Sequence, residues 1–143
     1  MSLNSSNDKA YFAGLLDGDG SIYVRAKPNS KYKFGYQIAP CISFFQSEAC
    51  EDFPKLCKRV GYGRIRLRKD GIYEFTITRQ DEIRYFIEEV SPYLILKKKQ
   101  AKLISAVLKQ KALVQTEKDF AKLLELIDSF RELNYSKKRK LRT

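Results

Sequence analysis

The residues best suited to chemistry lie between positions 13 and 21, where two aspartates, Asp17 and Asp19, stand among three glycines. Histidine is absent from the 143-residue sequence, which excludes Ser-His-Asp and Cys-His catalysis as well as histidine-bearing zinc sites. Any chemistry must therefore come from a carboxylate, a lysine, a hydroxyl group or a metal-bound water. An EF-hand interpretation of the aspartates fails, because its first and twelfth ligand positions would be Leu15 and Ala26.

Apolar spacing predicts a helix over residues 8–18 with Asp8 as its N-cap. Gly14 and Gly18 each cost this helix about 1 kcal/mol relative to alanine. They lie four residues apart, so they share one face where another backbone can approach closely. Asp19 follows at the helix C-terminus, where exposed carbonyl groups disfavour a carboxylate. Since such departures from local preference concentrate at functional sites, we expect this stretch to form one.

Alternating polar and apolar residues predict four strands, over residues 21–27, 32–46, 64–68 and 72–78. Further helices are predicted over residues 48–60, 81–90, 96–113 and 116–134. Pro54 favours a kink or a later start in the first of these, and Thr116 with Asp119 resembles a capping box. The predicted fold class is α+β, in the order αββαββα with extra C-terminal helices. Helices cover one face of an antiparallel four-stranded sheet.

By length the chain is predicted to hold one domain, residues 8–134, after a flexible lead over residues 1–7 and before a basic tail over residues 135–143. Three cysteines without a CxxC pair are expected to be buried free thiols. The sequence shows no apolar run long enough to span a membrane and no signal core. We therefore expect an intracellular protein, in the cytoplasm or an organelle matrix, that is not secreted.

The charge balance predicts a polyanionic partner. Lysine and arginine number 28 against 17 aspartates and glutamates, a formal net charge of +11, so nucleic acid is the first candidate and an acidic membrane the second. Two-stranded ribbons fit the DNA major groove, and a seven-residue strand of about 23 Å covers about seven base pairs. The residues expected to contact DNA are Tyr23, Arg25, Lys27, Asn29, Tyr32, Lys33, Gln37, Ser43, Arg64, Arg66, Arg68, Glu74, Thr76, Lys137, Lys138 and Arg139.

Residues 12–20, with the sequence Phe-Ala-Gly-Leu-Leu-Asp-Gly-Asp-Gly, closely resemble the signature of the LAGLIDADG homing endonucleases. The order of elements is similar to that of the family's single-motif members, over about residues 8–134. The resemblance implies a saddle-like sheet and a homodimer in which the signature helices of two chains pack together. The implied interface residues are Phe12, Ala13, Gly14, Asp17 and Gly18.

The resemblance also implies roles for particular residues. Asp19 is the implied divalent-metal ligand beside the scissile phosphate, with the backbone carbonyl of Gly18 as its metal-binding neighbour. Gln46 and Lys97 fall where relatives place a catalytic glutamine and lysine, although Lys98 and Lys99 adjoin Lys97. Some relatives have an arginine shortly after the glutamine, where this chain has Ser-Glu-Ala-Cys over residues 47–50.

The implied function is an intron-encoded, site-specific double-strand DNA endonuclease acting on a long pseudo-palindrome, with Mg²⁺ as cofactor and Mn²⁺ as a substitute. Elementary chemistry agrees, because bound Mg²⁺ supplies both an activated water and neutralisation of the leaving oxygen without histidine. Two alternatives remain open at this point. One is an RNA-binding maturase that assists intron splicing, and the other is a DNA-binding regulator without catalytic activity.

Overall fold

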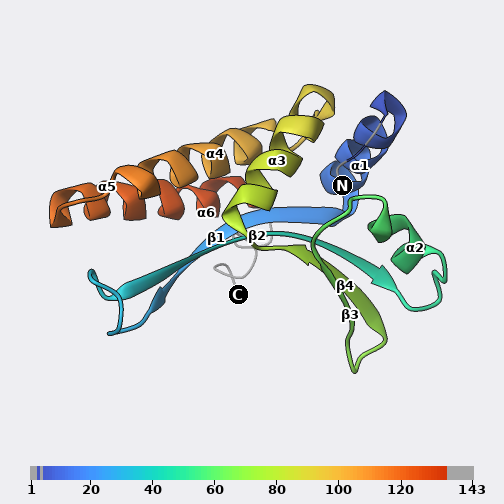
Figure 1. Ribbon diagram of the computed structural model, residues 1–143, viewed down its shortest axis with the longest axis horizontal. Helices are drawn as coiled ribbons and strands as arrows, with labels where there is room; N and C mark the ends of the chain where they lie inside the picture. The colour runs from blue at the N-terminus through green and yellow to red at the C-terminus, as the bar shows by residue number, and fades with distance from the viewer. Residues whose placement is uncertain (1–2, 4, 135–143) are drawn as a thin grey trace. The chain divides into compact units, whose positions relative to one another are not determined.

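The computed structural model describes residues 3 and 5–134 (Figure 1). The elements follow in the order α1, β1, β2, α2, β3, β4, α3, η1, α4, α5, α6, where η1 is a short 3₁₀ helix. The chain divides into two compact units. Unit 1 comprises Met1–Ile22 and Cys41–Lys98, and unit 2 comprises Tyr23–Pro40 and Lys99–Thr143. The predicted order αββαββα with additional helices is confirmed.

The four strands form one sheet in the order β1-β2-β4-β3. Antiparallel pairing places Phe44 opposite Phe75 on β2 and β4, and Arg66 opposite Glu74 on β3 and β4. The strands are β1 (Gly20–Pro28), β2 (Tyr36–Ser47), β3 (Arg64–Leu67) and β4 (Ile72–Ile77). The predicted α+β class with a four-stranded antiparallel sheet is therefore correct.

The core of unit 1 is built on aromatic contacts between helices and sheet. Phe12 on α1 (Ser6–Asp19) and Phe86 on α3 (Gln80–Val90) both meet Phe44 on β2 edge to face, with ring centroids 6.0–6.4 Å apart. Edge-to-face pairs add about 0.5–1.5 kcal/mol to the burial of their rings. This cluster fixes α1 over the end of β2, which is where the candidate site lies.

Helix α1 begins at Ser6, before the predicted start. Ser5 adopts an extended conformation and its side chain accepts a hydrogen bond from the Asp8 N–H at 3.1 Å, so Ser5 and not Asp8 is the N-cap. Asp8 instead forms an ion pair with Arg59 at 3.0 Å. Leu3 is buried. The structured part of the chain therefore extends into the predicted lead.

Helix α2 (Phe53–Lys58) is shorter than the predicted helix over residues 48–60. Proline is favoured in the first turn of a helix, where its missing N–H needs no partner, and Pro54 occupies that turn. The later start indicated by Pro54 is therefore correct. Cys57 on this helix is buried, as is Cys41, but Cys50 in the preceding turn is exposed, so the prediction of buried thiols is wrong for Cys50.

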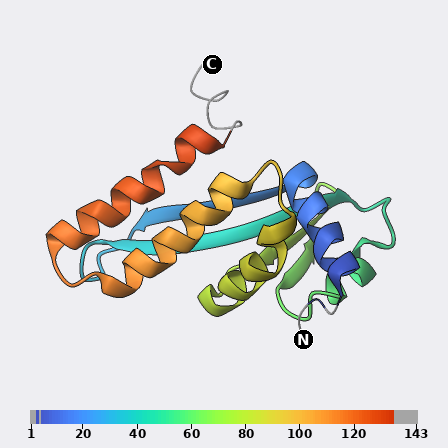
Figure 2. The same ribbon diagram turned by 90° about the horizontal axis from the view of Figure 1, so that it is seen from above.

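Unit 2 holds most of α4 (Lys98–Leu113) together with α5 (Glu117–Asp128) and α6 (Phe130–Leu133), and Figure 2 shows α5 running back from the end of α4. The predicted capping box is present between Thr116 and Asp119. Hydrogen bonds from the backbone N–H groups of Gln115 and Thr116 lower the pKa of Asp119. The single helix predicted over residues 116–134 is interrupted at Ser129, whose hydroxyl donates to the Glu125 carbonyl. No helix within the described residues could cross a membrane.

Candidate functional site

Asp19 and Gln46 come together from two elements of unit 1. Asp19 is the last residue of α1, and Gln46 lies next to the end of β2. The Gln46 Nε2 donates a hydrogen bond to Asp19 Oδ2 at 3.3 Å. Asp19 is exposed and Gln46 is half-buried. An exposed carboxylate next to an amide that can both donate and accept can bind a cation and orient a water molecule.

Lys97 reaches the same end of α1. Its ammonium group donates to the backbone carbonyl of Asp17 at 2.9 Å, one of the last four carbonyl groups of the helix, which lack a partner within the helix. A cation is favoured there by the helix dipole. Lys97 is half-buried, whereas Lys98 and Lys99 are exposed. Contact and burial therefore distinguish Lys97 from its two neighbours.

The two aspartates of the motif have different surroundings. The carboxylate of Asp17 accepts hydrogen bonds from the backbone N–H groups of Ile95 at 2.8 Å and Lys97 at 3.0 Å. Each of its oxygens accepts a hydrogen bond from a backbone N–H group of its own chain. The Asp17 side chain thus turns toward residues 95–97, and the prediction of Asp17 as a dimer contact stays a prediction.

One face of α1 is open. A Cβ atom added at Gly14 or Gly18 would meet nothing within 4 Å among the described residues, and both glycines are exposed. Phe12 and Ala13, by contrast, are 1% and 0% exposed in the chain's own core. The predicted interface is therefore wrong for Phe12 and Ala13, whose side chains are enclosed by their own chain, whereas Gly14 and Gly18 remain available for close approach of another backbone.

The oxygen ligands at the end of α1 fit a magnesium ion whose remaining coordination positions are filled by groups from outside the chain. Mg²⁺ is typically held by one or two carboxylates, with waters and substrate phosphates filling its octahedron. Among residues 3 and 5–134, no group of three or more histidine, cysteine, aspartate or glutamate side chains could hold a metal. The predicted ligands Asp19 and the Gly18 carbonyl supply oxygen atoms of the kind that Mg²⁺ prefers.

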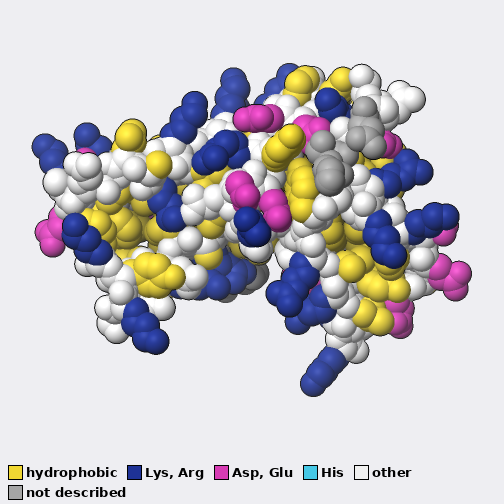
Figure 3. All heavy atoms as spheres, in the orientation of Figure 1, with side chains coloured by type: hydrophobic (Ala, Val, Ile, Leu, Met, Phe, Trp, Pro, Cys, Tyr) yellow, Lys and Arg dark blue, Asp and Glu magenta, His cyan; other side chains and the backbone are white. Residues whose placement is uncertain are grey.

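The residues of unit 2 that are predicted to contact DNA lie along the first hairpin and its turn. Arg25 and Lys27 alternate on β1 with the buried Val24, and Tyr32 and Lys33 are exposed in the turn. The remaining members are half-buried: Tyr23, Asn29 and Gln37. Lysine and arginine side chains stand out near the turns of both hairpins in Figure 3. The pattern expected of a basic exposed face on β1 is present.

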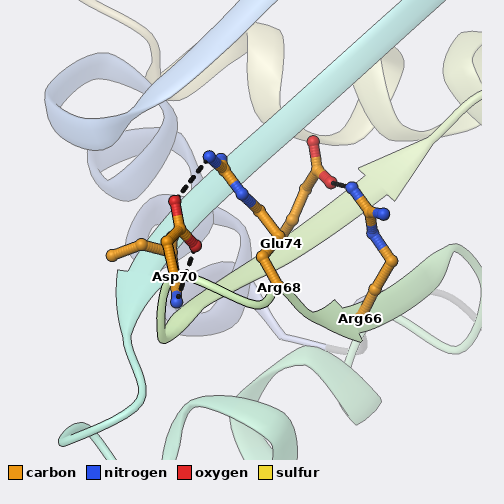
Figure 4. Close-up of polar contacts among 5 residues, drawn as sticks. Arg66, Arg68, Asp70 and Glu74 are labelled. Atoms are coloured by element: carbon orange, nitrogen blue, oxygen red, sulfur yellow. Dashed lines mark hydrogen bonds and ion pairs between the residues drawn. The ribbon is translucent and has the colours of Figure 1, made fainter.

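In unit 1 the β3–β4 hairpin carries the arginines. Arg66 donates to Glu74 at 2.6 Å across the strand pair, and Arg68 donates to Asp70 at 2.7 Å, so both guanidinium groups are partly neutralised (Figure 4). Opposite charges facing each other across an antiparallel pair stabilise it modestly. Arg64 is exposed and its strand partner Thr76 is half-buried.

Ser43 is a correction to the predicted DNA-contacting set. It is 0% exposed, and its hydroxyl is 2.7 Å from that of Ser21. Strand alternation places Ser43 on the face of β2 that is opposite to the face of the core residues Ile42 and Phe44. Its short side chain is nevertheless covered, because β2 has a neighbouring strand on each side. Lys137, Lys138 and Arg139 lie outside the described residues.

Two structural features were missed from the sequence. The first is the Asp17 contact with residues 95–97, because hydrogen bonds between positions about 80 residues apart leave no periodic signal. The second is an aromatic stack in unit 2, in which Phe120 on α5 lies against Phe34 at 5.0 Å and Tyr36 at 6.0 Å. The sequence gives no indication of this stack, because Phe120 is far along the chain from Phe34 and Tyr36.

Comparison with known proteins gives three matches that agree. The family model described as LAGLIDADG endonuclease matches residues 12–108. The chain is 33% identical over 132 residues to the DNA endonuclease I-CreI of Chlamydomonas reinhardtii, covering 91% of this chain and 80% of that protein. It is 32% identical over 137 residues to the DNA endonuclease I-CvuI of Chlorella vulgaris, covering 91% and 81%.

A solved structure of I-CvuI, in complex with the I-CreI target in the presence of Mg, superposes with a TM-score of 0.81 at 28% identity, covering 92% of this chain and 86% of that one. The family match spans well over half of the sequence and includes the motif at residues 12–20. On this evidence the chain belongs to the LAGLIDADG endonuclease family.

Proposed function

We propose that this protein is a site-specific double-strand DNA endonuclease that requires a divalent metal, Mg²⁺ or Mn²⁺, and acts as a homodimer. Family membership and the names of the relatives I-CreI and I-CvuI as DNA endonucleases support the class of reaction. The observation that carries the proposal is the meeting of Asp19, Gln46 and Lys97 at one end of α1. These three groups come from three separate parts of unit 1.

Each group has a distinct role in phosphodiester hydrolysis. Asp19 and the Gly18 carbonyl would hold Mg²⁺, which when bound would supply an activated water and neutralise the leaving oxygen. Gln46 has an amide that donates to Asp19 and an oxygen free to orient that water. Lys97 places a positive charge beside the last turn of α1, where it stabilises negative charge that develops on the phosphate.

The open face of α1 supports the proposed dimer. Each chain contributes one such carboxylate, so cutting both strands of a duplex requires a second copy. Gly14 and Gly18 offer the space for a second α1. Ile95 and Leu96, which are 76% and 72% exposed, lie in the segment bonded to Asp17 on that helix. Exposed apolar side chains beside a small-residue helix face favour a protein contact.

Sequence recognition is assigned to polar and basic side chains of the two hairpins. Arginine pairs with guanine and glutamine with adenine in the major groove, whereas lysines on phosphates position the protein without reading sequence. Residues with this chemistry are Arg25, Lys27 and Gln37 on the first hairpin, with Arg64, Arg66 and Arg68 on the second. The ion pair of Arg66 with Glu74 fixes the guanidinium direction before DNA binds.

The proposal is tested by selecting cleaved sites from a random duplex library in the presence of Mg²⁺ and then measuring the Asp19→Asn variant on the selected site. We expect the variant to bind the site but to cleave it at least about 100-fold more slowly, because the carboxylate charge that holds the cation is lost. Binding is measured by fluorescence anisotropy without divalent metal.

Asp128→Asn is the matched control, because Asp128 is also an exposed aspartate at the last position of a helix. It should cleave at the wild-type rate. Wild-type cleavage by Asp19→Asn would overturn the assignment of Asp19. A wild-type protein that cuts no library member with Mg²⁺ or Mn²⁺ would overturn the proposed function.

A further inference from the structure

Three hydrogen bonds tie the segment 95–97 to a single residue of α1. The Asp17 carboxylate accepts from the backbone N–H groups of Ile95 at 2.8 Å and Lys97 at 3.0 Å, and the Asp17 carbonyl accepts from Lys97 Nζ at 2.9 Å. The segment lies between η1 (Ser91–Tyr93) and α4, in a bend without regular backbone pairing. The N–H groups of Ile95 and Lys97 therefore depend on Asp17 for their partners.

The contacts fix the lysine without neutralising it. Both carboxylate oxygens of Asp17 are directed to backbone N–H groups, and the ammonium group binds a backbone carbonyl. Among the residues that the structure describes, Lys97 forms no ion pair with a carboxylate. An ammonium group has three donors, so two remain for an external anion.

The hydrogen bonds between Asp17 and the segment 95–97 lie at the same end of α1 as Asp19. Asp17 and Asp19 are two residues apart at the end of the same helix, a rise of about 3 Å along its axis. A lysine on a free four-carbon stem samples many rotamers, and holding it in one place removes that entropy before the reaction. Lys98 and Lys99 are exposed, which leaves their side chains the rotamer freedom that Lys97 has lost.

We propose that Asp17 is a positioning residue, which clamps the segment 95–97 and thereby holds the Lys97 side chain at the end of α1 that also carries Asp19. This role rests on the proposed endonuclease function. Asp17 itself touches neither DNA nor metal in this proposal. It acts through Lys97, as a hydrogen-bonding partner behind a catalytic group does.

The first test is the near-isosteric variant Asp17→Asn, whose amide offers one acceptor and one donor to two N–H groups. We expect the single-turnover cleavage rate at saturating enzyme to fall about 10- to 100-fold. The enzyme concentration that half-saturates the DNA should not change. Amide hydrogen exchange at Ile95 and Lys97 should accelerate, which reports the clamp independently of cleavage.

A double-mutant cycle separates positioning from general support of the fold. In a Lys97→Met background, Asp17→Asn should lower the remaining rate by less than about 2-fold, because the group it positions is gone. An equal fractional loss of rate with Lys97 present and with Lys97 replaced is not compatible with the proposal. Retained amide protection at Ile95 and Lys97 in Asp17→Asn would also overturn it.

A second variant leaves α1 intact. Ile95→Pro removes one of the two N–H donors, and Leu94 already has φ −71° and ψ 145°, the conformation that a residue before proline prefers. It should reduce the rate in the same direction, whereas Ile95→Ala, which keeps the N–H, should not accelerate exchange at Lys97. If Ile95→Pro cleaves at the wild-type rate, the clamp is not needed and the proposal fails.

Asp119→Asn is the matched control, because Asp119 also accepts hydrogen bonds from two backbone N–H groups, those of Gln115 and Thr116. It should alter local exchange at α5 without changing the cleavage rate. Failure of the proposed function is recognised separately, since the wild type would then cleave no DNA. Failure of the present proposal alone appears as a cleaving wild type with an unimpaired Asp17→Asn variant.

Discussion

Asp17 and Asp19 show how two identical side chains in one motif take different tasks. Asp17 turns to two backbone N–H groups of the segment 95–97, whereas Asp19 is exposed and contacts the Gln46 amide. Each oxygen of the Asp17 carboxylate already accepts one hydrogen bond, whereas Asp19 accepts its hydrogen bond through Oδ2. The two aspartates differ in their partners because their side chains leave the last turn of α1 in different directions.

The three cysteines are expected to differ in the reactivity of their thiols. Burial raises the pKa of the Cys57 thiol to about 12, so the thiolate that reacts with disulfide reagents is scarce at neutral pH. We expect Ellman's reagent to modify the exposed Cys50 rapidly in the native protein and to modify Cys41 and Cys57 only on unfolding. Cys50→Ser should remove the rapid phase, and a rapid phase that survives would contradict the burial of the other two thiols.

The same Cys57 thiol makes stability depend on pH. In the unfolded chain Cys57 loses its proton near pH 9, whereas the folded state keeps it up to the raised pKa. The unfolded state therefore binds fewer protons above pH 9, and the free energy of unfolding falls as pH rises in that range. Urea titrations at pH 8 and pH 10 should show a smaller fall for Cys57→Ala than for the wild type.

Among the secondary-structure elements, α5 supports the turn of the first hairpin. The turn is closed by backbone hydrogen bonds from Asn29 to Gly35 at 2.8 Å and from Gly35 to Tyr32 at 2.9 Å. Gly35 has φ +81°, which favours glycine. Phe34 in this turn stacks on Phe120 at 5.0 Å with an interplanar angle of 19°. The helix thus restrains the turn that presents Tyr32 and Lys33.

Phe120→Leu should therefore relax sequence discrimination at the base pairs that the turn reads. Leucine keeps most of the apolar burial but removes the stacking, worth about 0.5–1.5 kcal/mol, so the turn gains freedom. The affected base pairs are first mapped with Tyr32→Ala, and cleavage of substituted targets is then compared. Phe130→Leu, which replaces another buried aromatic residue of unit 2, is the control and should retain discrimination at those positions.

For the molecule as a whole, the open face of α1 is the feature that a single chain leaves unexplained. Two interior glycines reduce helix stability, yet nothing in the described part of the chain lies within 4 Å of a Cβ placed at either of them. Gly20 is a useful contrast, because a Cβ there would lie 2.6 Å from Leu16 Cδ1. The chain's own packing therefore gives no reason for Gly14 and Gly18, which accords with the proposed second copy.

Gly14→Leu should yield a folded monomer that does not make double-strand cuts. Leucine is favoured over glycine in a helix by about 0.8 kcal/mol, and its Cβ would meet nothing within 4 Å among residues 3 and 5–134, so circular dichroism should be unchanged. Analytical ultracentrifugation should show the loss of the dimer. Glu88→Leu, on the exposed side of α3, adds the same side chain elsewhere and should remain dimeric. A dimeric, active Gly14→Leu variant would contradict the proposed interface.

Local patterns in the amino-acid sequence were sufficient to predict the order of elements, the four strands, the capping box at Thr116 and the motif that contains Asp19. These features depend on contacts between residues close in sequence or on short periodic patterns, which a single chain displays directly. Pro54 likewise indicated the later start of α2, because proline acts on its own backbone.

The availability of individual residues, in contrast, depended on how the elements pack. The packing of the elements buries Phe12, Ala13 and Ser43, which strand alternation and the motif had placed at surfaces. It also distinguishes Lys97 from its neighbours through a contact with Asp17. Burial and hydrogen bonding between distant positions leave no mark in local spacing, because they arise only when separate elements meet. The carboxylate of Asp17 was visible in the sequence, but its partners 78 and 80 residues away were not.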